Sequence, residues 1–331
     1  MDNPVNQSDI QKSMLQKQKA DQRRKHILNL VLLALLLIAP AVFYPVFLMK
    51  ILCFALFAVA FNLLLGFTGL LSFGHAAFLA TGSYTTGYLL SNYSGLTTEM
   101  GIIVGTVAAT VLGVFFALVA IRRQGIYFAM ITLALAQLVY FMFVQAPFTG
   151  GEDGMHGVPR GYLFGFIDLE NNLAMYYFVL AVFLGGYLLV QRVVGSPFGQ
   201  VLKAIKQNEP RAVSLGYNVN QYKVLAFVMS AGLAGLAGSV KTVVFQLASL
   251  NDAHWHMSGE VILMTLLGGT GTLLGPVFGA TFVVNLEYQL SQGPLGDWVD
   301  PILGGIFVLT VIAFQSGIVG EIQKFVKKNL G

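Results

Sequence analysis

Charged residues are scarce in this sequence: Asp, Glu, Lys and Arg make up only 10% of its 331 residues, whereas 56% are hydrophobic. About a quarter of the residues of a soluble domain are charged. The composition therefore excludes an ordinary soluble domain and indicates an integral membrane protein. Several apolar runs reach the roughly 18–20 residues that a helix needs to cross a bilayer. The short alternating segments of a transmembrane β-barrel are missing, so we expect an all-α polytopic membrane protein.

The sequence also lacks the patterns of common catalytic and metal sites. Its one cysteine, Cys53, lies in an apolar run and has no partner for an internal disulfide. No GxxxxGK[ST], HExxH or CxxC segment occurs, which excludes a P-loop and these metal and redox motifs. His254 and His256 share a segment with Asp252, for which a surface loop is a better explanation than a metal site. We expect the chain to bind no cofactor, and any uphill transport to use an ion gradient or a partner ATPase.

The few charges are unevenly distributed. Most Lys and Arg residues fall in four clusters, at 12–25, 122–123, 192–223 and 324–328. Such clusters mark the cytoplasmic side of membrane proteins. They explain the net charge of +4 better than nucleic-acid binding does. With all four clusters inside, the apolar runs alternate across the membrane as about ten transmembrane helices. The predicted spans are 27–45, 47–66, 70–91, 101–121, 125–146, 173–191, 223–248, 258–270, 273–291 and 300–319.

This topology divides the chain into three parts. They are a cytoplasmic tail at 1–26, a transmembrane domain at 27–319 with a cytoplasmic loop at 192–222, and a cytoplasmic tail at 320–331. Both termini are thus expected in the cytosol. The first apolar run follows a basic segment, and Ala39-Pro40-Ala41 resembles a signal-peptidase site. An uncleaved anchor is preferred to a cleaved signal peptide because the basic segment is long.

Two stretches are rich in glycine: GFTGLLSFGHAAFLATGSYTTG at 66–87 and GGTGTLLGPVFG at 268–279. Glycine and proline interrupt helices, and irregular backbone within a membrane persists only when it is buried in protein or lines a cavity. Interrupted helices in both halves of a transporter indicate a transport path. Glycines also permit close helix packing. We expect these stretches to serve both close packing and a transport path. The similar segments at 64–69 and 266–271 indicate either an internal duplication or a chance similarity.

The loop at 195–223 is the only long polar run between the two ends of the chain. Its apolar residues recur at helical spacing, and Gly216 is a natural helix stop. The pattern predicts one amphipathic helix over 199–216, lying along the cytosolic surface in a groove of a soluble partner. Its apolar stripe comprises Val201, Leu202 and Ile205. A solvated connector between two spans is the alternative.

Four stretches together resemble one family. They are GLLSFGHAAFLATGSY at 69–84, GIYFAMITLALAQ at 125–137, GGEDGMHGVP at 150–159, and the region that runs from SPFGQVLKAIKQNEPRAVSLG at 196–216 through LAGLAG to MSGEVILMTLLGGTGTLLGPVFGA at 257–280. Through these motifs the chain resembles, from about residue 50 to 318, the LivM-type permease subunits of branched-chain amino acid ABC importers.

The resemblance implies a type II ABC importer permease fold in the bacterial inner membrane. It also implies a LivH-type second permease, a periplasmic solute-binding protein, and two ATPase subunits that use the ATP and Mg. The segment 199–216 resembles the loop by which such permeases dock onto their ATPases, which favours coupling over a plain connector. The residues assigned to coupling are Gly199, Val201, Leu202, Ile205, Glu209, Arg211 and Gly216. Members of the family also import urea, amides and aromatic acids, so the fold does not fix the solute.

Polar residues near the glycine-rich stretches and on the span at 125–146 are expected to line the substrate path. They are Thr68, Ser72, His75, Tyr84, Tyr127, Thr132, Gln137 and Thr270. The alternative for each is a hydrogen bond between helices. Lys241 joins this set because a charge inside a span is costly and marks a functional site. Its alternatives are snorkelling to the outer face or pairing with Glu260 or Glu287.

The segment 150–160 is a glycine-rich loop expected on the outer side of the membrane. It is the expected docking site of the binding protein, through Glu152, Asp153 and Arg160. Two other functions remain open. An ion-coupled transporter would need carboxylates at mid-membrane, which the spans lack. An intramembrane serine hydrolase would use Ser72 and His75, but these lie three residues apart with no GxSxG setting.

Overall fold

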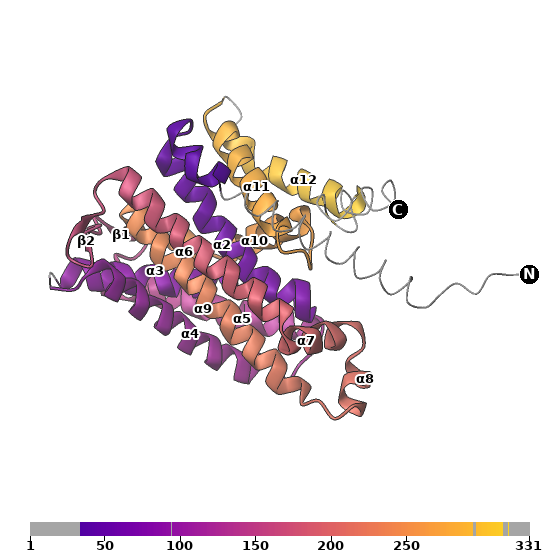
Figure 1. Cartoon of the computed structure of the whole chain (residues 1–331). Coiled ribbons are helices and arrows are strands. Elements are labelled where there is room, and N and C mark those ends of the chain that lie inside the picture. The colour runs from indigo at the N-terminus through magenta and orange to yellow at the C-terminus, as the bar shows by residue number, and fades with distance from the viewer. Residues whose placement is uncertain (1–33, 94, 294–295, 314–316, 318–331) are drawn as a thin grey trace, which may run out of the picture.

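The computed structural model describes residues 34–93, 95–293, 296–313 and 317. Long helices, most of them inclined in the same general direction, make up most of this part of the chain (Figure 1). The longer helices are α2 (Pro45–Thr68), α3 (His75–Asn92), α4 (Thr98–Ala120), α5 (Ile126–Gln145), α6 (Asn172–Gly195), α7 (Pro197–Gln207), α9 (Val219–Phe245), α10 (Trp255–Gly268), α11 (Gly275–Ser291) and α12 (Val299–Ala313). The shorter ones are η1 (Ala39–Ala41), η2 (Pro147–Thr149), α8 (Glu209–Ser214), η3 (Leu250–Ala253) and η4 (Gly296–Trp298).

Each predicted span after the first coincides with a described helix, from α2 to α6 and from α9 to α12. Five of them, α2, α4, α5, α6 and α9, are long and apolar enough to cross a membrane. The first predicted span, 27–45, lies partly outside the described residues, and the total of ten spans stays a prediction. The two terminal tails also lie outside the described residues.

The described residues are predominantly helical, as the all-α prediction expects, and they also include a few short strands. Four strands of two residues each lie in or beside the loop between α5 and α6: β1 (Met155–His156), β2 (Tyr162–Leu163), β3 (Ile167–Asp168) and β4 (Leu247–Ala248). β1 pairs antiparallel with β4, just after α9, and β2 pairs with β3 as a hairpin. The first pairing ties the loop to the end of α9.

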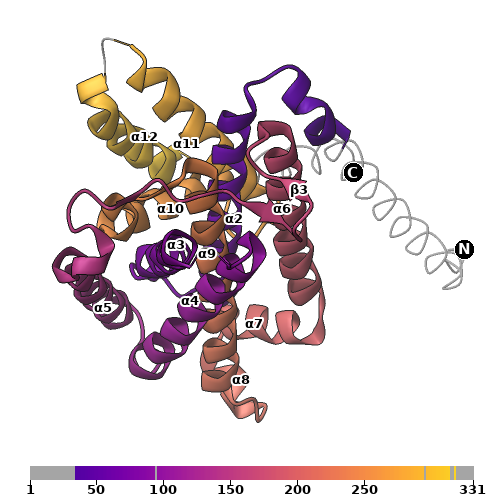
Figure 2. The same ribbon diagram turned by 90° about the vertical axis from the view of Figure 1, so that its left-hand side faces the viewer.

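Helix α2 is the centre of the fold. Its sequence is apolar on every side, as in a helix that is surrounded by protein or by lipid. It packs against α6, α9, α10 and α11. In Figures 1 and 2 it runs between α10–α12 on one side and the group of α3, α4 and α9 on the other. By contrast, most of the apolar surface of α4 and α5 is exposed.

Glycine lets α3 and α9 approach each other closely. A methyl group added at Gly82 would lie 2.1 Å from the carbonyl oxygen of Gly235, and one added at Gly238 would lie 1.9 Å from that of Leu79. Only glycine fits where two backbones are so near. The glycines within α3 therefore serve helix packing and cause no break in the helix.

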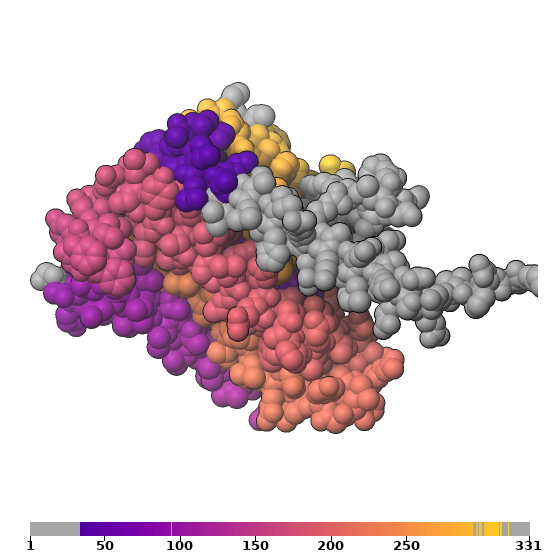
Figure 3. Space-filling view, in the orientation of Figure 1, coloured from indigo at the N-terminus to yellow at the C-terminus, as the bar shows by residue number. Residues whose placement is uncertain are grey.

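The two polar segments lie at opposite ends of the molecule. In Figure 3, the loop that contains β1–β3 lies at the left and the residues of α7 and α8 lie at the lower right. The long helices run between these ends. This separation is the one expected if the loop at 147–171 is outside and the loop at 196–218 is in the cytosol.

Candidate coupling and translocation sites

Two short helices form the polar segment between α6 and α9. Ser196 caps α7 by accepting the backbone N–H of Gly199, and Asn208 caps α8 by accepting that of Arg211. Asn218 caps α9 in the same way. Such side chains satisfy the unpaired N–H groups at a helix start. Because Asn208 is an extended cap, α7 and α8 form an elbow, and the prediction of one continuous helix over 199–216 is wrong.

The apolar stripe of α7 faces its own chain. Leu202 is 0% exposed and Ile205 is 3% exposed, and Gly199 is also buried. Ile205 forms a small cluster with Ala212 and Val219, against which Val201 packs. The expectation that this stripe is free for a partner's groove is therefore wrong, because the chain itself covers it.

The exposed apolar surface of the elbow lies further along. Val213 is 57% exposed and Leu215 is 68% exposed, and Tyr217 is exposed as well. Arg211 is exposed beside them, and Gly216 has a φ of 87°, a backbone conformation that favours glycine. Together these residues form an exposed apolar patch on the elbow.

Glu209 holds the elbow to the helices on either side. Its Oε1 accepts from Lys223 Nζ in α9 at 2.7 Å and from Gln124 Nε2, just before α5, at 2.9 Å. Lys223 is almost fully buried. A buried ion pair costs much to break, because one charge is then left unpaired. The elbow and α9 are thus expected to move as one body.

Lys206 connects α7 with the end of α2. Its Nζ donates to the carbonyl oxygen of Gly66 at 2.7 Å. Burial of the ammonium group lowers the pKa of Lys206. This hydrogen bond joins α7 to the central helix at its first glycine-rich stretch.

The two glycine-rich stretches meet. The helices break at residues 69–74, between α2 and α3, and at 269–274, between α10 and α11. Asn62 of α2 donates to the carbonyl of Thr272 at 2.8 Å and accepts the N–H of Gly271 at 3.0 Å. A methyl group on Gly66 would lie 2.7 Å from the nitrogen of Gly271. The breaks thus lie between helices, and the second one is buried partly against α2.

Three of the predicted path residues tie the first break together. Thr68 donates to the carbonyl of Leu64, and Ser72 accepts the N–H of Gly74. Thr132 of α5 accepts the N–H of Phe73 at 3.1 Å. All three side chains are buried. Each of these side chains forms a hydrogen bond with a backbone N–H or carbonyl group. This agrees with the alternative of a structural hydrogen bond rather than a path-lining group.

His75 lies in an aromatic enclosure at the start of α3. Its Nε2 is 2.8 Å from Ser230 Oγ of α9, and Ser230 donates to the carbonyl of Ala60. The rings of Phe61, Phe78 and Phe227 surround the imidazole. His75 and Ser72 share no hydrogen bond in the described part of the chain, and both are fully buried. The geometry gives no support to a Ser72–His75 hydrolase.

The remaining polar candidates are dispersed. Tyr84 is buried and stacks on Phe143 at 4.6 Å between ring centroids. Tyr127 is exposed on α5, and Gln137 and Thr270 are partly exposed. These four side chains do not form one site with the helix break at residues 69–74.

Lys241 forms an ion pair with Asp252 of η3, and not with Glu260 or Glu287, the two acids named in the pairing alternative. Glu287 instead pairs with Lys50 at 3.1 Å, and Glu260 lies 3.7 Å from His256 Nδ1. Asp252 is 2% exposed. Asp252 lies only eleven residues after Lys241 in the sequence. The chain turns back after β4, and this turn brings the two side chains together.

Arg160 is a structural residue of the loop between α5 and α6. It is only 8% exposed and donates to Asn172 Oδ1 and to the carbonyl of Val244, both at 2.8 Å. Its expected place on a docking surface is therefore wrong, since the guanidinium is used inside the protein. Glu152 and Asp153 are exposed.

Sequence reasoning missed Asn62, Ser230, Asp252 and Gln124 as site residues. Asn62 carried a visible signal, since it is the one polar residue in the middle of an apolar helix. Ser230 and Asp252 carried none, because their partners come from distant or folded-back segments.

Comparison with known proteins assigns the class. A family model described as the permease component of branched-chain amino acid transport systems matches residues 45–311. The match covers most of the chain, which therefore belongs to this family of ABC transporter permeases, as the motifs predicted. The chain is a transport subunit of the membrane, and the family's members are permeases rather than enzymes.

Individual permeases from several organisms are also similar to this chain. The high-affinity branched-chain amino acid transport system permease protein LivM of Escherichia coli (strain K12) is 25% identical over 288 residues, covering 80% of this chain and 67% of the relative. A probable branched-chain amino acid transport permease protein LivM of Methanocaldococcus jannaschii is 24% identical over 184 residues, 51% of this chain and 53% of the relative. The autoinducer 2 import system permease protein LsrC of Klebsiella pneumoniae subsp. pneumoniae is 32% identical over 143 residues, 41% and 40% of the two chains. Similarity thus extends to permeases of different named solutes.

Proposed function

We propose that this chain is a membrane-spanning subunit of an ATP-driven importer of branched-chain or related amino acids. The observation that carries the proposal is the family match over residues 45–311, with a LivM permease similar over 80% of the chain. In the proposed assembly it pairs with a LivH-type permease and two ATPase subunits. A periplasmic solute-binding protein delivers the solute.

In this proposal the elbow of α7 and α8 couples the chain to an ATPase. The exposed Val213, Leu215 and Tyr217 supply the apolar contact. Leu202 and Ile205 position this surface from inside, and Glu209 fixes the elbow to α9. Closure of the ATPases would then act on α9, and through Lys206 on α2, as a rigid-body displacement.

The proposed path runs beside the breaks at 69–74 and 269–274. Thr68, Ser72, His75, Thr132 and Tyr84 shape its wall from within, because their side chains are buried and most of them form hydrogen bonds. Tyr127, Gln137 and Thr270 have exposed or partly exposed side chains and are the ones able to face the solute or the second permease.

The outer loop is the proposed contact for the binding protein. The pairing of β1 with β4 and the buried Arg160 hold the loop on the end of α9, and Glu152 and Asp153 lie exposed on it. The proposed location is the bacterial inner membrane, with both termini in the cytosol. That orientation rests on the distribution of Lys and Arg residues.

Uptake of radiolabelled leucine by cells tests the proposal. A strain lacking the gene should lose uptake and regain it on complementation, and unlabelled valine and isoleucine should compete. Urea, amides and aromatic acids serve as competitors for the alternative solutes. Unchanged leucine uptake in the deletion strain, with loss of uptake of one of these other solutes, would reassign the substrate.

A further inference from the structure

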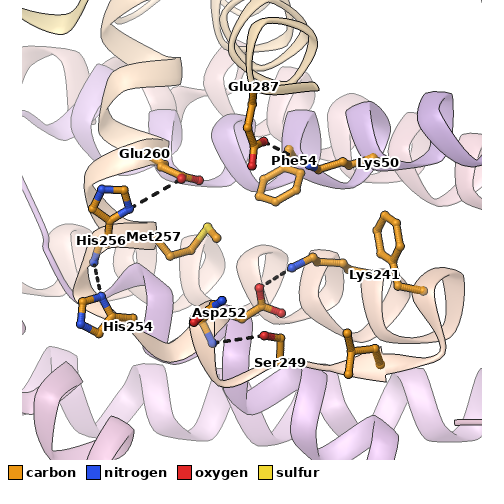
Figure 4. A pocket seen from close by; sticks show the side chains of 13 residues that line it. Lys50, Phe54, Lys241, Ser249, Asp252, His254, His256, Met257, Glu260 and Glu287 are labelled. Carbon is orange, nitrogen blue, oxygen red and sulfur yellow. Dashed lines mark hydrogen bonds and ion pairs between the residues drawn. The ribbon is translucent and has the colours of Figure 1, made fainter. Parts of the chain in front are cut away.

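The strongest feature outside the coupling region is a cavity at the outer ends of the central helices. It has a volume of about 670 Å³, within the range of about 300–1,000 Å³ that small-molecule pockets occupy. Residues from α2, α9, η3, α10 and α11 line it (Figure 4). These elements include both helices next to the second glycine-rich stretch.

Two ammonium groups meet at one part of this cavity. Lys50 Nζ lies 5.9 Å and Lys241 Nζ 5.3 Å from the centre of the Phe54 ring. The two lysines reach this ring from different helices, α2 and α9. Lys50 pairs with Glu287 and Lys241 with Asp252, and the remaining N–H donors of the two ammonium groups can bind a further anionic group such as a ligand's carboxylate.

Carboxylates surround the same space. Glu260 with His256 comes from one side, Glu287 from a second and Asp252 from a third (Figure 4). Asp252 is nearly fully buried, and its Oδ2 has no hydrogen-bond partner among the described residues. A buried carboxylate oxygen without a donor is costly, and a ligand's ammonium group would satisfy it.

Apolar side chains complete the lining. Phe54, Phe245, Leu247 and Met257 lie among the charged groups. The cavity therefore offers a cationic part, an anionic part and an apolar surface in one space. The lining side chains pair with one another as Lys50–Glu287, Lys241–Asp252 and His256–Glu260, and these pairs still leave Asp252 Oδ2 without a donor among the described residues.

We propose that this cavity is a low-affinity site for a small zwitterion with an apolar side chain. The solute's carboxylate would lie near Lys50 and Lys241, and its ammonium group near Asp252 and Glu260. The side chain would contact Phe54 and Met257. The site receives the solute on the outer side before translocation, and this assignment rests on the function proposed above.

Cysteine protection tests the site without relying on transport. The Met257→Cys variant is assembled with its partners in right-side-out vesicles washed free of binding protein, and labelled with a small, membrane-impermeant thiol reagent. The unmodified chain gives the background, since Cys53 is its only cysteine and is buried. A Tyr162→Cys variant on the exposed hairpin is the matched control for reagent access.

L-leucine should slow labelling of the Met257→Cys variant about 10-fold at roughly ten times its Kd, because only the unoccupied cavity reacts. Isoamylamine lacks the carboxylate and 4-methylpentanoate lacks the ammonium group, so each should protect much less. The Tyr162→Cys variant should be unaffected by all three. Adding Lys241→Met or, separately, Lys50→Met should remove the protection by leucine.

Equal protection by the amine would overturn the proposal in favour of a cation site, and no protection by leucine would overturn it outright. Leucine uptake by vesicles with binding protein restored separates this result from the function. Uptake without protection rejects the cavity and keeps the importer, whereas protection without ATP-driven uptake keeps the cavity and rejects the importer.

Discussion

Asn62 fixes the backbone at Gly271 and Thr272: its Oδ1 accepts the Gly271 N–H at 3.0 Å, while its Nδ2 donates to the carbonyl of the following residue, Thr272. One side chain in the central helix thus holds the break between α10 and α11. Lys206 of α7 binds the same stretch of α2 at the carbonyl of Gly66. The elbow and the second break are therefore joined through less than two turns of α2.

Replacing Asn62 should destabilise the protein. The change Asn62→Ala leaves the Gly271 N–H and the Thr272 carbonyl without their partner, which costs about 1–3 kcal/mol for each group left unsatisfied. Thermal unfolding of the detergent-solubilised protein measures the effect as a lower midpoint. Asn92→Ala is the control, because Asn92 bonds only within its own helix at an exposed site. Equal midpoints for both variants would show that Asn62 does not hold the break.

The pair of Lys241 and Asp252 should behave as a buried unit. Lys241→Met or Asp252→Leu alone leaves one uncompensated charge and should cost about 3–5 kcal/mol, whereas the double variant should recover most of that loss. A double-mutant cycle on thermal stability gives the coupling energy. Additive effects of the two single changes would mean that Lys241 is neutralised by another group.

The buried His75–Ser230 pair should be structural. Ser230→Ala removes the partner of His75 Nε2 and should cost about 1–3 kcal/mol of stability. A fluorophosphonate probe should label neither Ser72 nor Ser230 in the purified protein, because both are inaccessible. Labelling that disappears in the Ser72→Ala variant would revive the hydrolase alternative.

The exposed surface of the elbow should govern association with the ATPase. The pair of changes Val213→Asp and Leu215→Asp removes two aliphatic side chains from the proposed contact, worth about 3 kcal/mol or roughly 100-fold in affinity. Co-purification with the ATPase should fall while membrane insertion stays normal. Gln207→Asp, also on the surface of the elbow, is the matched control and should bind normally.

The buried stripe of α7 provides a contrasting case. Leu202→Asp places a charge in a fully enclosed position and should lower stability and expression, with or without a partner. Size-exclusion profiles of the subunit expressed alone measure this loss. A stable, well-folded Leu202→Asp variant that fails only in ATPase binding would restore the first interpretation of the stripe as a partner contact.

The spans were predictable because their signal is local. Apolar length and the positions of Lys and Arg depend on the sequence alone, so α2, α4, α5, α6 and α9 match predicted spans closely. The stripe of α7 was also visible, but amphipathicity tells only that a face is covered. It does not tell that Ala212 and Val219 of the same chain cover it.

Pairing of charges was not predictable in the same way. Lys241 has three acids within reach of its helix end, and the choice of Asp252 depends on the turn that follows β4. Arg160 looked like a surface charge in a glycine-rich loop, yet the loop folds over it and directs its guanidinium to Val244 and Asn172. Both outcomes depend on tertiary contacts that no local pattern encodes.

The most direct test of the account is leucine uptake by proteoliposomes that contain this chain, a LivH-type partner and both ATPase subunits, with binding protein outside. The account predicts uptake that requires ATP inside and binding protein outside, persists when ion gradients are dissipated, and is lost in the Val213→Asp, Leu215→Asp variant. Uptake by this chain without the ATPases, driven by an ion gradient, would contradict it.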